Sequence, residues 1–166
     1  MAKDNPKQKV LLVCIHNAAR SQMAEAFFRE FYGDNYDVRS AGSEPQEVDP
    51  QAIQVMAEID IDISHQTSNS LNDYTGQEFD YVITICGNYS ACPFFLGGKN
   101  YFIHPFEDPS SFTGPDEERL EILRRLRDEI GDWVQDMNNY QICDETCNGP
   151  NCCDLETNTD DDNPCC

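Results

Sequence analysis

The stretch KVLLVCIHNAARSQMAEAFFREFY, residues 9–32, contains the two elements that decide the fold. Residues 9–15 form a short, almost continuous apolar run, which is typical of a strand buried on both faces of a parallel sheet. Residues 23–31 place Met, Ala and Phe at helical spacing, which predicts a helix over 21–32 that ends near Gly33. A buried strand followed at once by an amphipathic helix indicates a parallel β–α–β unit.

The same alternation continues along the body of the chain. Further strands are predicted over residues 36–42, 80–86 and 100–105, a helix over 49–59, and a long last helix over 120–137. Strands separated by helical connections predict an α/β domain with a four-stranded parallel sheet flanked by helices and right-handed crossovers. Ligands of such sheets bind beyond the carboxyl ends of the strands.

The composition changes near residue 141. Residues 143–166 contain seven acidic residues, no Lys or Arg, and one large apolar residue. Such a segment buries too little apolar surface to order itself unless a metal gathers it. We therefore predict a domain over residues 1–140 and a flexible, acidic, Cys-rich tail over 141–166.

The charge of the chain restricts its partners. The formal net charge is −20, and such a field repels nucleic acid and anionic membranes. No apolar run approaches the roughly 20 residues of a membrane span, and the N-terminus lacks a signal-peptide pattern. We expect a cytoplasmic monomer that binds neither nucleic acid nor membrane. In that reducing compartment the nine cysteines are more typical of catalysis or metal binding than of a disulfide framework.

The segment CIHNAAR, residues 14–20, joins the first predicted strand to the first predicted helix. Backbone N–H groups and the helix dipole at such a junction favour an anion, and Arg20 adds a planar fork of donors. The same field stabilises a nucleophilic Cys14 thiolate. A buried structural cysteine at a strand end is the alternative. The candidate anion-binding residues are Cys14, Ile15, His16, Asn17, Ala18, Ala19, Arg20 and Ser21.

Three more residues extend this candidate site. Asp108 follows the fourth predicted strand, so its loop can lie over the same pocket and supply a general acid; a solvated loop aspartate is the alternative. Cys86 ends the third predicted strand and shares the carboxyl edge of the sheet with Cys14. Cys92 follows Cys86 after a short loop.

Several segments together resemble the thioredoxin-coupled arsenate reductases built on the low-molecular-weight tyrosine phosphatase fold. The resemblance covers about residues 8–140. It rests on VLLVCIHNAARSQMAEAF, RSAGSEP, IDISHQTS, DYVITIC with the CP that follows it, FEDPSSFTGPDEE and RRLRDEI. The phosphatase relatives share the first loop and an Asp-Pro motif. Gln22 after Ser21 and Ser110 after Pro109 favour the reductase branch.

The resemblance implies a relay of three thiols. Cys14 attacks arsenate and forms a thiol–arsenate adduct. Cys86 then attacks Cys14, which releases arsenite and leaves a Cys14–Cys86 disulfide. Cys92 displaces Cys14, and the Cys86–Cys92 disulfide moves outward for reduction by thioredoxin. The resemblance also assigns the general-acid role to Asp108.

The resemblance implies no required cofactor. In some relatives a polar cluster shapes the loop or holds a potassium ion, and the matching residues are Asn17, Glu25, Ser40 and Asp62. Solvated polar residues are an equally good interpretation of these four positions.

Two other classes of function stay open. The first is a phosphatase that uses Cys14, Arg20 and Asp108 on phosphate monoesters. The second is a protein that binds a metal or arsenite through its tail, because clustered thiolates bind Zn, Cu(I) or trivalent arsenic. The tail spacing C-x3-C-x4-CC-x11-CC matches no standard zinc ribbon. Two alternatives are therefore open: the thiols of the tail are incidental, or the tail acts as a redox partner for its own chain. The tail cysteines are Cys143, Cys147, Cys152, Cys153, Cys165 and Cys166.

Overall fold

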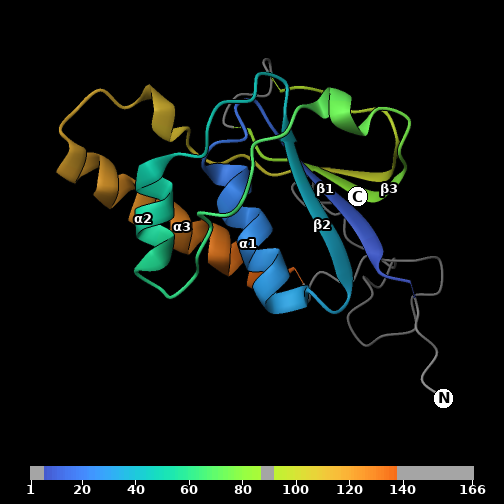
Figure 1. Ribbon diagram of the computed structural model, residues 1–166, viewed down its shortest axis with the longest axis horizontal. Helices are drawn as coiled ribbons and strands as arrows, with labels where there is room; N and C mark the ends of the chain where they lie inside the picture. The colour runs from blue at the N-terminus through green and yellow to red at the C-terminus, as the bar shows by residue number, and fades with distance from the viewer. Residues whose placement is uncertain (1–5, 87–91, 138–166) are drawn as a thin grey trace, which may run out of the picture.

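The computed structural model of the chain describes residues 6–86 and 92–137. Its strands are β1 (Gln8–Cys14), β2 (Tyr36–Gly42), β3 (Phe79–Thr84) and β4 (Gly98–Ile103). They form one four-stranded sheet in the order β2-β1-β3-β4, and every neighbouring pair is parallel (Figure 1). The predicted four-stranded parallel sheet is confirmed. The predicted tail lies outside the described residues.

Helices and short turns connect these strands. The helices are α1 (Arg20–Tyr32), α2 (Pro50–Ala57) and α3 (Asp116–Asp136), and the short 3-10 turns are η1 (Leu71–Tyr74) and η3 (Pro109–Ser111). Asp49 caps α2 by accepting a hydrogen bond from the Gln51 N–H, which fits its position just before Pro50. Across the described parts of the chain, no helix combines the length and the apolar character needed to cross a membrane.

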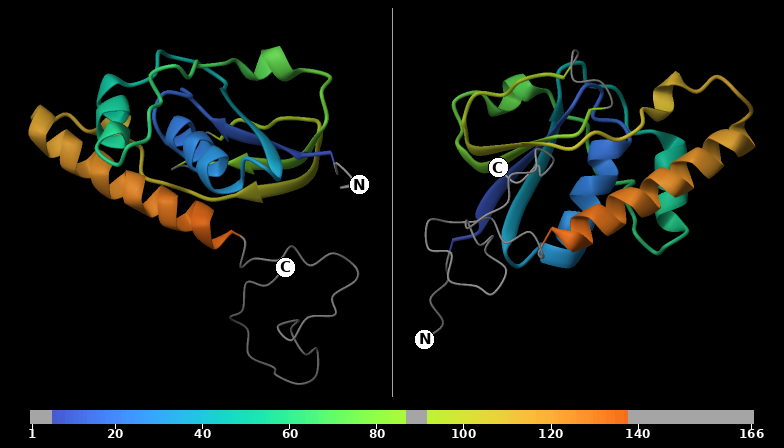
Figure 2. Two further views of the ribbon diagram at one scale, coloured as in Figure 1. Left: turned by 60° about the horizontal axis from the view of Figure 1, so that its bottom comes forward. Right: turned by 180° about the vertical axis from the view of Figure 1, so that it is seen from behind.

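The strand β1 is covered on both faces from Val10 onward, which explains why residues 10–14 are apolar. The helices α1, α2 and α3 gather on one side, where α3 packs along α1 and α2, and η1 lies on the other side (Figure 2). Alternate residues of β1 enter the two cores: Leu12 packs in the helical core and Leu11 in the second one. Each fully buried Leu side chain contributes about 1.5–3 kcal/mol.

The strand order reverses beside β1. From β1 the chain goes to β2 on one side, whereas β3 and β4 lie on the other side. Connections that leave in opposite directions open a crevice at the carboxyl ends of the two central strands. Cys14 is the last residue of β1, and Cys86 lies two residues beyond β3. The Ile85 N–H donates to the Val13 carbonyl oxygen at 2.8 Å, so both cysteines lie at the carboxyl ends of β1 and β3.

Candidate active site

The loop between β1 and α1, residues 15–19, directs its carbonyl oxygens outward. The carbonyl oxygens of Ile15, His16 and Ala18 accept hydrogen bonds of 2.8, 2.9 and 2.9 Å from N–H groups of the segment 44–49. In a trans peptide plane the N–H group points opposite to the carbonyl oxygen. The N–H groups of His16, Asn17 and Ala19 therefore point away from the segment 44–49, and a set of N–H groups that points inward in this way suits a tetrahedral oxyanion.

Asn17 holds the loop in this shape. Its φ of 49° lies in the left-handed region, which Asn adopts more readily than most residues. Its Nδ2 donates to the hydroxyls of Ser21 and Ser40 at 2.8 and 2.9 Å. Its Oδ1 accepts from the Asn69 N–H at 2.8 Å, and its carbonyl oxygen accepts from Gln22 Nε2 at 2.8 Å. The side chain thus joins α1, β2 and the segment after α2 to the loop.

Gly42, at the end of β2, lies against this loop. A Cβ at residue 42 would lie 2.4 Å from the Ile15 carbonyl oxygen and 3.0 Å from the Asn17 nitrogen. Both are backbone atoms of the loop, so a side chain at this position displaces the loop itself.

We predict that Gly42→Ala destabilises the fold by about 1–3 kcal/mol. We also predict that it weakens binding of inorganic phosphate by about tenfold, equivalent to about 1.4 kcal/mol. Urea unfolding and titration calorimetry measure the two effects. Gly131→Ala is the control, because its added Cβ would instead meet the Phe27 ring at 3.0 Å and leave phosphate affinity intact. Wild-type phosphate affinity in folded Gly42→Ala protein would contradict this role.

Cys14 and Arg20 stand at the two ends of the loop, and both are buried. Cys14 is 2% exposed at the end of β1, and Arg20 is 3% exposed at the start of α1. Arg20 Nη1 donates to the Phe106 carbonyl oxygen at 3.3 Å, and Nη2 lies 3.2 Å from Asp108 Oδ2. The guanidinium thus connects residues 15–19, called the anion loop below, to the loop that carries Asp108.

Asp108 is held as a carboxylate. Its Oδ1 accepts from the N–H and the hydroxyl of Ser110 at 3.0 and 2.8 Å. Burial alone would raise the pKa of Asp108, but the Ser110 hydrogen bonds and the positive charges of Arg20 and His16 lower the pKa below its usual value. Asp108 therefore needs a proton before it can act as an acid.

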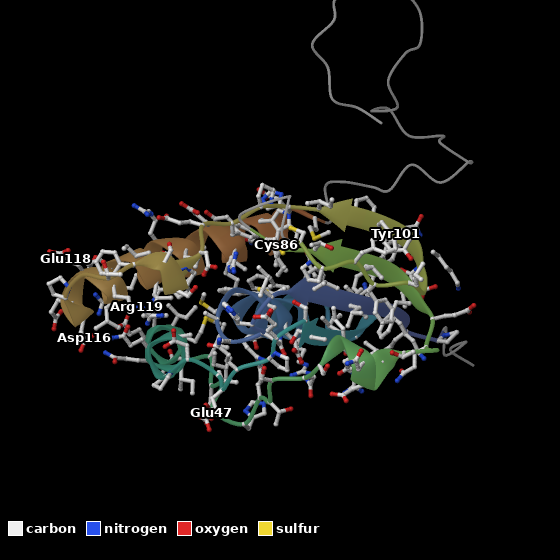
Figure 3. The ribbon with its side chains drawn as sticks, turned by 90° about the horizontal axis from the view of Figure 1, so that it is seen from above. Glu47, Cys86, Tyr101, Asp116, Glu118 and Arg119 are labelled. Atoms are coloured by element: carbon white, nitrogen blue, oxygen red, sulfur yellow. The ribbon has the colours of Figure 1, made fainter. Side chains whose placement is uncertain are left out.

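Cys86 and Cys92 complete the set of thiols. Cys86 is 1% exposed and lies just past the end of β3, in the interior of the molecule (Figure 3). Burial raises the pKa of the Cys86 thiol well above its usual value. A hydrogen bond with Cys92 and the negative charge of Cys14 raise it further, against the opposing effect of Arg20. None of these three cysteines is joined in a disulfide.

The polar cluster predicted around the loop forms only in part. Glu25 is 5% exposed; its Oε2 accepts from the Ser40 hydroxyl and its Oε1 pairs with Arg29. Burial raises the pKa of Glu25, against the effects of Ser40 and Arg29. Together with Asn17, which donates to Ser40, these residues brace the loop.

Asp62 departs from the expected arrangement. Its carboxylate accepts from the Ser64 N–H at 2.8 Å on an exposed turn. Asn69, and not Asp62, joins Asn17, Glu25 and Ser40 in the polar cluster. Its N–H donates to Asn17, and its Nδ2 donates to the Ser40 carbonyl oxygen at 3.2 Å. Residues 64–70 are all polar, so no periodicity marks Asn69 among them.

The side-chain oxygens of this cluster have protein partners. Both carboxylate oxygens of Glu25 are engaged, and one partner is the cationic Arg29. The Asn17 side-chain oxygen accepts from Asn69. A potassium ion at these positions stays a prediction.

The hydrogen bonds of two glutamines, the buried Gln22 and the half-buried Gln66, were not predicted from the sequence. Gln22 is buried in the first turn of α1, and its Nε2 donates to the Asn17 and Thr67 carbonyl oxygens at 2.8 and 3.1 Å. Gln66 Nε2 donates to Gln22 Oε1 at 2.8 Å. The sequence offered one signal for these contacts: Gln22 is a polar residue directly before the apolar positions of α1, which begin at Met23.

The geometry is that of a thiol phosphatase loop, and comparison with known proteins agrees. The profile of the family described as low molecular weight phosphotyrosine protein phosphatase matches residues 9–104. The chain belongs to the low molecular weight phosphotyrosine protein phosphatase family.

Among the relatives of this chain are arsenate reductases. An arsenate reductase of Halalkalibacterium halodurans is 42% identical over 130 residues, which cover 78% of this chain and 94% of that protein. The solved structure of an arsenate reductase in the phosphate binding state has a TM-score of 0.66 and 34% identity and covers 78% and 95% of the two chains. A thioredoxin-dependent arsenate reductase of Corynebacterium glutamicum has a TM-score of 0.55 and 32% identity and covers 81% and 64%.

Proposed function

We propose that this protein reduces arsenate to arsenite with electrons from a thioredoxin-like dithiol protein. The observation that carries the proposal is the succession of thiols from the anion loop outward. Cys14 ends β1, Cys86 lies two residues beyond the adjacent strand β3, and Cys86 is hydrogen-bonded to Cys92. A phosphatase uses the nucleophile, the arginine and the acid alone, whereas two further thiols in line provide a route for two electrons. The arsenate reductases among its relatives support the proposal.

In the first step arsenate binds to the inward N–H groups and to Arg20. The Cys14 thiolate attacks arsenic, and one oxygen departs as water after receiving a proton from Asp108. Bound arsenate competes with Asp108 for Arg20 and brings negative charge beside it, and both effects raise the pKa of this carboxyl. Asp108 thus takes up a proton that arrives with the substrate and returns it to the departing oxygen.

In the second step Cys86 attacks the Cys14 sulfur of the adduct. A sulfur–sulfur bond forms, the sulfur–arsenic bond breaks, and its electron pair stays on arsenic. Arsenic is reduced from the pentavalent to the trivalent state, two thiols are oxidised to one disulfide, and the Cys86 proton leaves with arsenite. Cys92 then attacks the Cys86 sulfur and releases the Cys14 thiolate. The external dithiol reduces the Cys86–Cys92 disulfide.

We predict that Asp108→Asn slows the first step by about 100-fold, because proton donation to a leaving oxygen contributes about this much. Phosphate affinity should stay equal or increase, because a carboxylate beside the anion is lost. Rapid-quench assays of the first turnover measure the rate.

Glu107→Gln is the matched control for this prediction. Glu107 is the adjacent residue, is exposed, and pairs with Arg125 at 2.8 Å. The substitution removes the same charge outside the pocket and should leave the first turnover unchanged. An equal loss in both variants, or no loss in Asp108→Asn, would contradict the acid role.

The proposed function is tested directly with the reduced full chain. Arsenate, thioredoxin, thioredoxin reductase and NADPH are added, and NADPH oxidation and arsenite are followed together. We expect one arsenite for each NADPH oxidised, dependent on both the chain and thioredoxin. Hydrolysis of a small aryl phosphate should be slow beside this reaction. Arsenite at the level of the enzyme-free blank, with rapid aryl phosphate hydrolysis, would favour the phosphatase alternative.

A further inference from the structure

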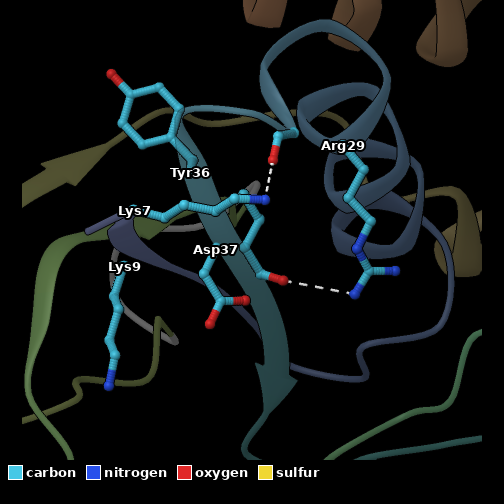
Figure 4. A pocket seen from close by; sticks show the side chains of 7 residues that line it. Lys7, Lys9, Arg29, Tyr36 and Asp37 are labelled. Atoms are coloured by element: carbon cyan, nitrogen blue, oxygen red, sulfur yellow. Dashed lines mark hydrogen bonds between the residues drawn. The ribbon is translucent and has the colours of Figure 1, made fainter. Parts of the chain in front are cut away.

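A basic pocket lies at the end of the sheet opposite to the anion loop. It has a volume of about 490 Å³, and its lining includes Lys7, Lys9, Arg29, Tyr36 and Asp37 (Figure 4). Lys7 and Lys9 flank the start of β1, which pairs with the start of β2 through Gln8 and Tyr36. The whole chain has 11 Lys and Arg against 31 Asp and Glu, so three cations around one pocket contrast with the general acidity of the protein.

The cations of the pocket keep donor capacity for an anion. Lys7 Nζ donates to the Gly33 carbonyl oxygen at 2.5 Å, which uses one of the three donors of an ammonium group. Arg29 Nη2 donates to the Val38 carbonyl oxygen at 3.5 Å (Figure 4) and pairs with Glu25. The carboxylate of the pocket, Asp37, has its own partner in Arg39 at 3.3 Å. The pocket is therefore cationic as a whole.

The chain leaves its last helix beside this pocket. The Tyr32 hydroxyl donates to the Gln135 carbonyl oxygen at 2.7 Å, which fixes the end of α3 against the end of α1. The Tyr32 ring is in edge contact with the Tyr36 ring, which lines the pocket, at a centroid distance of 6.2 Å. The end of α3 therefore lies about one aromatic ring away from the pocket.

The sequence after α3 supplies a complementary ligand. Residues 154–162, DLETNTDDD, contain five acidic residues and no Lys or Arg. They follow Met137 by 17 residues, and an extended chain spans about 3.3 Å per residue, so the distance to the pocket is covered several times over. A short tether also gives an effective concentration on the order of millimolar for binding in cis.

We propose that the acidic segment 154–162 docks in the basic pocket of its own chain. Its carboxylates bind Lys7, Lys9 and the pocket side of Arg29, and salt weakens this binding because the groups are solvent-exposed. The docked tail holds its cysteine pairs at the opposite end of the sheet from Cys86, about 20 Å away, the length of a seven-residue strand. Docking thus keeps the thiols of the tail apart from the thiols of the relay.

Amide NMR of the reduced full chain tests the contact. In Asp160→Asn/Asp161→Asn/Asp162→Asn, the signals of Lys7, Lys9 and Tyr36 should shift. Adding about 0.5 M NaCl to the wild type should move the same signals in the same direction, because that salt screens exposed charges. Asp116→Asn/Glu117→Gln/Glu118→Gln is the matched control, since it removes the same charge at the far end of α3 (Figure 3). The control should leave the pocket signals in place.

Two results would overturn the proposal. If the pocket signals respond to neither the tail variant nor the α3 control, or respond equally to the two, the tail is not in the pocket. Signals that move with protein concentration would show that the segment binds a second copy instead of its own chain.

Proteolysis provides an independent measurement. A Glu-specific protease should cut after Glu156 at least about threefold faster in Lys7→Glu/Lys9→Glu, because an undocked segment is open to cleavage. Lys99→Glu/Arg125→Glu makes the same change of charge outside the pocket and should not accelerate this cut. Equal rates in the two variants would overturn the docking, and circular dichroism checks that both are folded.

Discussion

Cys14→Ser should lower arsenate reduction by about 10⁴-fold or more, as is typical when the nucleophile of a covalent mechanism is removed. A serine hydroxyl is not ionised at neutral pH and cannot form the sulfur–arsenic bond. The loop N–H groups and Arg20 remain, so inorganic phosphate should bind with near wild-type affinity. Steady-state arsenite production and calorimetry with phosphate measure the two quantities in the same preparation.

Cys92→Ser is the control for Cys14→Ser, because it also removes one thiol. In this variant the first turnover should survive and only later turnovers should fail. Arsenite formation by Cys14→Ser would contradict both the reductase and the phosphatase interpretation, since both need this thiolate.

Cys86→Ser should lower multiple-turnover arsenate reduction by at least about 10³-fold. The adduct can form on Cys14, but no neighbouring thiol displaces arsenite from it. Slow hydrolysis of a small aryl phosphate should persist, because that reaction uses Cys14, Arg20 and Asp108 alone. Unchanged arsenate reduction by Cys86→Ser would contradict the relay.

The wild-type second step carries a pH signature of Cys86. Because burial raises the pKa of this thiol, only a small fraction is thiolate near neutral pH. As long as the pH is below this pKa, the thiolate fraction grows about tenfold for each unit by which the pH rises. Disulfide formation in a single turnover should therefore accelerate as pH rises, and a rate that falls with rising pH would contradict Cys86 as the attacking thiol.

The parts of the fold that were predictable depend on local patterns. Residues 10–15 are apolar because β1 is buried on both faces from Val10 onward. The helical spacing of Met23 to Phe28 follows the part of α1 that enters the core. Cys14 and Cys86 could be placed at one edge because the carboxyl ends of parallel strands meet there. These inferences needed only periodicity and strand direction.

The contacts around the loop depend on long-range packing instead. Asn69 and Gln66 reach Asn17 and Gln22 from more than 40 residues away. Residues 64–70, which bring them there, have no apolar period, and Asp62 was implied by the resemblance alone. The basic pocket was not predictable from the sequence either. Lys7 and Arg29 line the same pocket only because β1 pairs with β2 beside the end of α1.

The order of the thiols is the central claim, and trapping the first disulfide tests it most directly. Reduced Cys92→Ser protein is mixed with one equivalent of arsenate without oxygen or thioredoxin, alkylated, digested and mapped by mass spectrometry. The mechanism predicts one arsenite per chain and a disulfide between the peptides of Cys14 and Cys86. Arsenite released while both cysteines are recovered alkylated, or a disulfide that joins Cys14 to a tail cysteine, would contradict it.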